Sequence, residues 1–294
     1  MKIGYFAIGI GPLTEPSAIK AVAVTVERLG FSTLWAPEHV VLLSEYASHY
    51  PYSSGEFPMP VDTPFGDPFT TLTYAAALTS KIRLATGICL VPEHNPLVLA
   101  KTVATLDRLS GGRFILGTGI GWLEEEFQAI GVTWERRAHR TREYIEAMRL
   151  LWSSHEQASY SGEFVNFRGA LSFPKPAHNK GVPVWFGGES GPALRRVAEY
   201  GDGWIGFNLT PAEAAPKIKR IEELLKAAGR KRSDVELAVS PYMKPMTIDD
   251  LKRYRDLGVD EVAVVVFDLP PTERELVAKI EKVARDFVEP AAKL

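Results

Sequence analysis

Cysteine is almost absent from this chain of 294 residues, because Cys89 is its only one. A disulfide within the chain is therefore excluded, and so is a zinc site built on several cysteines. No apolar run approaches the roughly 20 residues that a membrane-spanning helix needs. Residues 1–16 contain one lysine and a short apolar stretch without a small-residue cleavage site, which is not the pattern of a signal peptide. We therefore expect a protein of the cytoplasm that does not insert into a membrane.

An excess of charge of one sign is also missing. Lys and Arg total 34 and Asp and Glu total 36, a net charge of -2, so we expect no nucleic-acid partner and no polybasic membrane surface. The chain has no His-x-His pair and no carboxylate cluster at predicted strand ends, and we expect no metal site. The glycines of residues 117–121 have the spacing G-x-G-x-G, which is not the dinucleotide-binding fingerprint. A small-molecule substrate remains the best expectation.

What the chain does contain is a regular alternation of short apolar runs and helical patterns. Hydrophobic residues make up 46% and charged residues 24%, which is typical of a globular protein. The predicted strands are residues 2–7, 33–36, 82–87, 113–117, 183–187, 203–206, 235–240 and 261–267. Eight strand–helix units require parallel strands covered by helices and predict a (β/α)8 barrel, with an open doubly wound sheet as the alternative. We expect one domain over residues 1–294.

Helix boundaries are marked by capping residues. Asp67 and Asn95 each precede a proline, a combination that begins helices. In the helix after Asn95, the spacing of Val103, Leu106 and Leu109 predicts that all three face the core. Further helices are expected over residues 122–130, 136–152 and 272–287.

Two long segments interrupt the alternation. Residues 40–66 are rich in Tyr, Ser, Pro and Phe and follow the second predicted strand. Residues 153–181 precede the fifth predicted strand. Loops of this length are often lids or binding loops. We expect residues 40–66 to form a lid over the substrate, and we interpret residues 153–181 as a second insertion.

The active site of such a barrel lies at the carboxyl ends of its strands. Glu38 and His39 follow the second strand, and a histidine there suits a proton donor or acceptor, so both are candidate catalytic residues. The alternative is a loop histidine bonded to backbone. His94 also follows a strand, but it lies beside the expected helix cap. Cys89 is better explained as a small buried hydrophobic residue.

Two glycine-rich segments follow strands. The candidate cofactor-binding residues in them are Gly119 and Gly121 within residues 117–121, and Gly187, Gly188, Ser190 and Gly191 within residues 187–191. Small residues between a strand and a helix expose backbone N–H groups to an anion, and Arg195 and Arg196 one turn later could add charge. Residues 187–191 therefore predict a phosphate site; a tight turn with Ser190 as an ordinary N-cap is the alternative. Trp122 could face a ring-shaped ligand. Other strand-end candidates are Asn208, Tyr242 and Asp268.

Four stretches together resemble the luciferase-like monooxygenase superfamily of flavin- and deazaflavin-dependent barrels. They are LWAPEH at 34–39, ATGICLVPEHNP at 85–96, KTVATLDRLSGGRFILGTGIGWLEEEF at 101–127 and PVWFGGESGPALRRVAEYGDGWI at 183–205. The chain is most similar to the branch of probable oxidoreductases that use the deazaflavin coenzyme F420.

The resemblance implies hydride transfer between this cofactor and a small organic molecule, in a homodimer. His39 would stand beside the reacting ring, and Gly87 and Ile88 match the place of a non-proline cis peptide in relatives. The two glycine segments and Trp122 would hold the ring edge and the phosphate tail. Trp122 stands where deazaflavin-dependent sugar-phosphate dehydrogenases carry a catalytic glutamate, and residues 124–126, three glutamates, are expected to face elsewhere. An FMN-dependent monooxygenase that activates dioxygen is the first alternative, and a non-catalytic flavin-binding protein is the second.

Overall fold

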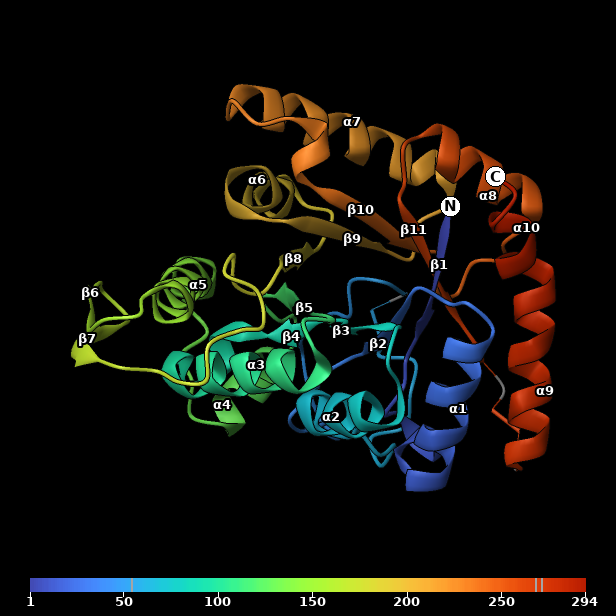
Figure 1. The fold of residues 1–294 in the computed structure, drawn as a ribbon, viewed down its shortest axis with the longest axis horizontal. Helices are drawn as coiled ribbons and strands as arrows, with labels where there is room; N and C mark the ends of the chain where they lie inside the picture. Colours follow the sequence, from blue (N-terminus) through green and yellow to red (C-terminus); the bar gives the residue numbers. More distant parts are fainter. Residues whose placement is uncertain (54, 268, 271) are drawn as a thin grey trace.

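A closed barrel of eight parallel strands forms the centre of the protein (Figure 1). The structure is a computed structural model, and it describes residues 1–53, 55–267, 269–270 and 272–294. The barrel strands are β1 (Lys2–Phe6), β2 (Thr33–Ala36), β3 (Arg83–Thr86), β5 (Phe114–Gly119), β8 (Val184–Gly187), β9 (Gly203–Phe207), β10 (Glu236–Ser240) and β11 (Glu261–Val265). Pairing of β1 with β11 and of β3 with β5 closes the ring. The predicted barrel is confirmed, and the open sheet is excluded.

Helices surround this barrel on the outside (Figure 1). They are α1 (Pro16–Arg28), α2 (Pro68–Leu78), α3 (Pro96–Ser110), α4 (Glu124–Ala129), α5 (Arg137–Ser153), α6 (Gly191–Tyr200), α7 (Pro211–Ala227), α8 (Ile248–Asp256) and α9 (Glu273–Val283). A π-helical turn over Ala284–Val288 and the short α10 (Glu289–Ala291) continue the last helix. Within the described part of the chain, no helix is both long and apolar enough to cross a bilayer.

The helix starts follow the predicted capping chemistry. The Asp67 side chain accepts a hydrogen bond from the backbone N–H of Thr70, and Asn95 accepts from Leu97 and Val98. These bonds satisfy N–H groups that have no partner inside a helix. Helix α3 ends at Gly111, whose φ of 72° lies in the left-handed region.

Three local predictions are wrong. Leu109 is 65% exposed, because the buried face of α3 runs through Val103, Leu106 and Ser110 and Leu109 lies off that face. The helix expected over residues 122–130 begins only at Glu124, so Trp122 lies in the loop before it. Strand β5 runs to Gly119 and not to Gly117, so the first three residues of the glycine segment 117–121 are strand. An added Cβ on Gly117 would stand 2.0 Å from the carbonyl oxygen of Thr86, so glycine is needed where these neighbouring strands approach each other.

The barrel interior is filled by large side chains. Trp35 and Trp185 meet there with ring centroids 5.6 Å apart, and Phe6 and Ile115 pack in the same cluster. At the amino ends of the strands, the buried Glu261 carboxylate accepts hydrogen bonds from Trp35 Nε1 (2.8 Å) and from an Arg83 guanidinium nitrogen (2.9 Å). A plugged barrel of this kind leaves the carboxyl end of the strands for the site.

The two insertions differ in structure. Residues 153–181 contain an antiparallel hairpin, β6 (Ala158–Ser161) with β7 (Asn166–Ala170), which extends beyond α5 (Figure 1). Sequence patterning did not predict this hairpin, because its strands are short and largely exposed and so lack a hydrophobic face. The described part of residues 40–66 has no helix or strand. Two backbone hydrogen bonds of 2.8 Å tie its end to the barrel: the N–H of Gly11 donates to the carbonyl oxygen of Pro64, and the N–H of Gly66 donates to that of Gly9.

Candidate functional site

A cavity of about 880 Å³ opens at the carboxyl ends of the barrel strands. Its wall combines strand ends, the glycine segments and residues 40–66, from here on called the lid. Of the predicted site residues, those that line it are Glu38, His39, Gly87, Ile88, Gly119, Gly121, Trp122, Gly187, Gly188 and Ser190. Gly191, the first residue of α6, lies next to the wall without lining it. Asp268 lies outside the described residues. Residues 153–181, all of them described, contribute nothing to this wall.

The peptide between Gly87 and Ile88 is cis, as the resemblance implied. It links β3 to the short β4 (Cys89–Leu90), which pairs with the end of β5. The Ile88 side chain reaches toward β5, because an added Cβ on Gly119 would stand 1.8 Å from Ile88 Cδ1. Glycine at 119 therefore makes room for Ile88 at the cavity floor.

His39 is held by a glutamate that sequence reasoning placed elsewhere. Its Nδ1 lies 2.9 Å from Glu126 Oε2, and Glu126 Oε1 accepts from the backbone N–H groups of Val40 (2.6 Å) and Val41 (3.1 Å). The Glu126 side chain is only 1% exposed. The expectation that residues 124–126 face away is thus wrong for Glu126. Because Nδ1 is engaged, Nε2 is the ring nitrogen left to exchange a proton in the cavity.

Glu38 has a different environment from its neighbour His39. Its Oε2 accepts the N–H of Leu90 (2.5 Å), and its Oε1 lies 2.9 Å from His94 Nε2. Burial acts to lower the pKa of His94, but the hydrogen bond and the charge of Glu38 outweigh burial and raise it. Glu38 thereby ties the β2 end to β4. Its carboxylate is engaged in holding the wall, and a catalytic role for it stays a prediction.

Glu38, Cys89 and His94 are also the one set of possible metal ligands that the described residues contain. Burial, then Glu38, raise the pKa of the Cys89 thiol well above its usual range, so the thiol keeps its proton. The hydrogen bonds of Glu38 to Leu90 and His94 account for this cluster without a metal. The predicted absence of a metal stays a prediction.

A further carboxyl group lies behind the pair of His39 and Glu126. Glu93 has both oxygens buried without a hydrogen-bond partner among the residues that the structure describes. Burial and the negative charges of Glu126 and Glu38 raise the pKa of Glu93 to about 9. Glu93 is therefore a neutral acid at pH 7. The sequence gave no signal for Glu93, because the three carboxyl groups lie far apart along the chain and only the fold brings them together.

The segment 187–191 has the chemistry of an anion site. Ser190 caps α6 by accepting from the N–H of Ala193, and Gly188 has a φ of 100° that favours glycine. Arg196, one turn along α6, lines the cavity, and its buried Nε has no hydrogen-bond partner in the described structure. Burial lowers the pKa of this guanidinium, and an anion beside it would offset that cost. These residues fit a phosphate group.

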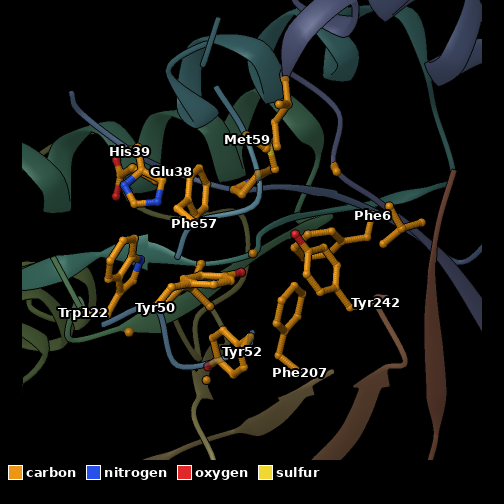
Figure 2. A pocket seen from close by; sticks show the side chains of 18 of the residues that line it. Phe6, Glu38, His39, Tyr50, Tyr52, Phe57, Met59, Trp122, Phe207 and Tyr242 are labelled. Carbon is orange, nitrogen blue, oxygen red and sulfur yellow. The ribbon is translucent and has the colours of Figure 1, made fainter. Parts of the chain in front are cut away.

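Aromatic side chains of the lid, together with Trp122, enclose His39. Phe57, Phe65 and Trp122 meet its ring edge-on, with centroids 5.2, 5.4 and 5.9 Å away. Tyr50 contacts both Phe57 and Trp122 (Figure 2). The imidazole is 9% exposed and so is largely shielded from water.

The start of α4 anchors the lid from below. Glu125 Oε1 accepts from the N–H of Ala47 (2.6 Å) and of Ser48 (3.2 Å), next to the bonds of Glu126 to residues 40 and 41. On the opposite side, Asn208 donates to the carbonyl oxygen of Tyr52 (2.8 Å). Residues 40–66 thus form part of the cavity wall, and α4 holds their first half in place. Their role as a lid over the substrate stays a prediction.

Comparisons with known proteins agree with this architecture. The luciferase-like monooxygenase family model matches residues 1–244. An uncharacterized protein of Mycobacterium tuberculosis is 37% identical over 270 residues, 90% of this chain and 92% of its own length. A 5,10-methylenetetrahydromethanopterin reductase of Archaeoglobus fulgidus is 30% identical over 207 residues, 70% of this chain and 60% of the reductase.

Solved structures show the same fold at low identity. An F420-dependent secondary alcohol dehydrogenase in complex with an F420–acetone adduct superposes with a TM-score of 0.76 and 19% identity, covering 96% of this chain and 97% of the other. The oxygenating constituent of 3,6-diketocamphane monooxygenase from Pseudomonas putida, in complex with FMN, gives 0.64 and 19%, over 86% of this chain and 70% of the other.

Proposed function

Because this chain belongs to the luciferase-like monooxygenase family, we propose that it is an oxidoreductase that transfers a hydride between the deazaflavin coenzyme F420 and a small organic substrate. The observation that carries the proposal is His39 on the wall of a cavity bounded by the two glycine segments, with the buried Glu126 holding its imidazole. A hydride transfer to or from an oxygen-bearing carbon needs a partner that moves a proton, and His39 Nε2 fills that role.

The residues present fit the cofactor at both of its ends. Ile88, Gly119 and Trp122 would hold the ring system, and Ser190 with Arg196 would hold the phosphate. When bound, the deazaflavin supplies a ring carbon that gives or takes the hydride. His39 holds the proton at Nε2, Glu126 fixes the imidazole, and the lid aromatics exclude water from the reacting atoms.

The choice of deazaflavin over FMN rests on the resemblance of the four sequence stretches. It is supported by the F420-dependent secondary alcohol dehydrogenase, in which the same fold holds an F420–acetone adduct. FMN stays the alternative, since the same fold holds FMN in the diketocamphane monooxygenase. The glycine segments and the EH pair at 38–39 suit either ring system.

Titration of the purified chain tests the cofactor. Tryptophan fluorescence follows the binding of each cofactor. We expect F420 to bind at least tenfold tighter than FMN, a difference in binding free energy of about 1.4 kcal/mol. Trp122 lines the cavity and serves as the local reporter. Equal or reversed affinities would assign FMN, and consumption of dioxygen by the reduced protein would then identify a monooxygenase.

A matched variant locates the phosphate site. Arg196→Gln should weaken the binding of F420 on the order of tenfold. The same variant should bind a deazaflavin that lacks the phosphate tail almost as tightly as the natural chain does. Arg195→Gln is the control, because Arg195 is exposed and does not line the cavity. If the chain binds F420 tightly but turns over no substrate, the second alternative, a non-catalytic flavin-binding protein, is favoured.

A further inference from the structure

Helices α5 and α6 are neighbours on the outside of the barrel and run in the same direction (Figure 1). Arg142 of α5 pairs with Glu199 near the end of α6 at 3.5 Å, and Arg149, two turns later on α5, pairs with Asp202 just beyond α6 at 2.8 Å. Contacts that advance together along both helices require a parallel arrangement. The first turns of α5 and α6 therefore lie next to each other, at the end of the barrel where the cavity opens.

Three arginines gather at these first turns and are called the arginine cluster from here on. Arg137 and Arg140 belong to the first turn of α5, and Arg196 belongs to the second turn of α6. The positive charges of Arg196 and Arg140 both act on Arg137. Because Arg196 also lines the cavity, the cluster is continuous with the anion site at Ser190.

The N–H groups of the cluster are poorly used within the chain. In all three arginines, Nε is buried and has no hydrogen-bond partner among the residues that the structure describes. Arg137 lies over the Trp134 ring, 3.4 Å from its centroid, and the 5% exposed Arg140 donates to the carbonyl oxygen of Thr133. Burial lowers the pKa of each of the three guanidinium groups. A buried cation without a counterion is unfavourable, so the cluster is suited to hold an anion.

Acidic side chains nearby do not balance these charges. Glu124 acts on Arg137 and Glu135 acts on Arg140, but burial outweighs both of these charges. The Glu124 carboxylate accepts a hydrogen bond from Gln128 (3.3 Å), and Glu135 is exposed to water. The cluster therefore retains a net positive charge beside the cavity.

We propose that the arginine cluster is a second anion subsite, which binds a carboxylate that follows the phosphate in the tail of the cofactor. This inference rests on the proposed function, in which Ser190 and Arg196 hold the phosphate. Arg137 is half-buried and is the group that such a carboxylate can reach, while the buried Arg140 contributes its charge. A guanidinium group matches a carboxylate in shape and can bind it through two parallel N–H donors.

The subsite would distinguish the two candidate cofactors by their tails. F420 carries carboxylates beyond its phosphate, whereas FMN ends at its phosphate. A ligand that stops at the phosphate leaves Arg137 and Arg140 without a counterion, and a ligand that continues supplies one. The cluster therefore favours the longer anionic tail, independently of the ring system.

Two deazaflavins that share one ring test the proposal, namely F420 and a deazaflavin that ends at its phosphate. In fluorescence titrations at fixed ionic strength, we expect F420 to bind on the order of tenfold tighter to the natural chain. Arg137→Gln should remove most of this difference by weakening F420 alone. Arg195→Gln is the control, because it removes one exposed positive charge beside the cluster and should leave the difference unchanged. A difference that persists in Arg137→Gln would overturn the proposal.

Competition separates a carboxylate subsite from an enlarged phosphate site. Glutarate should raise the apparent Kd of F420 and not that of the shorter deazaflavin, whereas inorganic phosphate should raise both. Arg137→Gln should lose the effect of glutarate and keep the effect of phosphate. Competition by phosphate alone would make the cluster part of the phosphate site and overturn the carboxylate assignment.

Failure of this proposal and failure of the proposed function give different results. If neither deazaflavin binds, the proposed function is overturned and the second subsite with it. If both bind with equal affinity, the proposed function stands, and only the second subsite is overturned.

Discussion

His39 is set apart from the other histidines by its contacts. Glu126 holds Nδ1 at 2.9 Å, three aromatic rings surround the imidazole, and Nε2 remains for the cavity. A buried carboxylate that orients an imidazole fixes both its tautomer and its direction. Glu126 is therefore a positioning residue.

Removal of the His39 imidazole should lower the rate of turnover without weakening the binding of the cofactor. We expect His39→Ala to lower turnover on the order of 10²-fold, because a positioned proton-transfer group typically contributes that much or more. Cofactor affinity should change far less. Steady-state kinetics and cofactor titration of the same preparation measure the two effects.

His155→Ala is the matched control for this experiment, because His155 is exposed and lies outside the cavity. It should retain full activity. Unchanged turnover in His39→Ala with a true substrate would remove His39 from the mechanism.

Glu93 should make the stability of the protein depend on pH. Its pKa rises from an ordinary value of 4.5 to about 9 in the folded state. Between these values the folded chain keeps the proton and the unfolded chain has lost it, so stability falls as pH rises through this window. Glu93→Gln has no proton to lose and should gain stability over the natural chain between pH 5 and 8.5, by up to about 1.4 kcal/mol per pH unit.

Urea unfolding at pH 5, 7 and 8.5 measures this difference. Glu222→Gln serves as the control, because Glu222 is exposed on α7 and should track the natural chain at every pH. A constant difference between Glu93→Gln and the natural chain across the three pH values would contradict a raised pKa at Glu93.

At the scale of elements, the lid depends on α4 for its position. Glu125 and Glu126, in the first turn of α4, accept four backbone N–H groups from residues 40–48. Residues 57–65, in contrast, contribute Phe57, Met59 and Phe65 to the cavity wall. Residues 40–48 are thus held by α4, whereas residues 57–65 face the ligand space and are tied to the barrel at their end, through Pro64.

Ligand binding should therefore protect the second part of the lid more than the first. We expect amide hydrogen exchange over residues 57–65 to slow when cofactor and substrate analogue bind, because the ligand fills the space beneath these residues. Amides of residues 40–48 should change little, since Glu125 and Glu126 already bond to them. The hairpin of β6 and β7 is an internal control, and equal exchange over 57–65 in both states would show a static wall.

Sequence patterning was accurate for elements whose signal is local. The caps Asp67 and Asn95 begin helices where predicted, because a capping side chain bonds only to N–H groups two or three residues away. It was inaccurate for β5, whose length depends on pairing with β8 and β4. It also missed the hairpin of β6 and β7, whose strands are mostly exposed.

At the scale of the whole molecule, α3 presents apolar side chains to the outside. Val98 and Leu109 are each 65% exposed, and Leu97 is 36% exposed. Exposure of several apolar side chains to water on one helix is unfavourable, and association with another chain can bury them. The resemblance of the chain to its superfamily implies a homodimer.

We therefore expect the protein to form a homodimer, with a mass in light scattering of twice the 32.5 kDa of one chain. Val98→Glu should shift it toward the monomer, because it places a charge on the exposed face of α3. Val24→Glu, on the exposed face of α1, is the control and should leave the mass unchanged. A natural chain that elutes at 32.5 kDa across micromolar concentrations would contradict the dimer.

The sequence by itself determined the barrel and predicted the end of it at which the cavity opens. Apolar runs and helical spacing report each residue's own environment, and eight repeats of strand and helix close into one ring because parallel strands require covering helices. The same local logic placed His39 and residues 187–191 at strand ends. Tertiary structure decided which groups meet there. Glu126 reaches His39 across 87 residues of chain and His94 reaches Glu38 across 56, and the lid brings its rings onto both. Such contacts depend on how loops fold over one another, and no period or spacing along the chain encodes them.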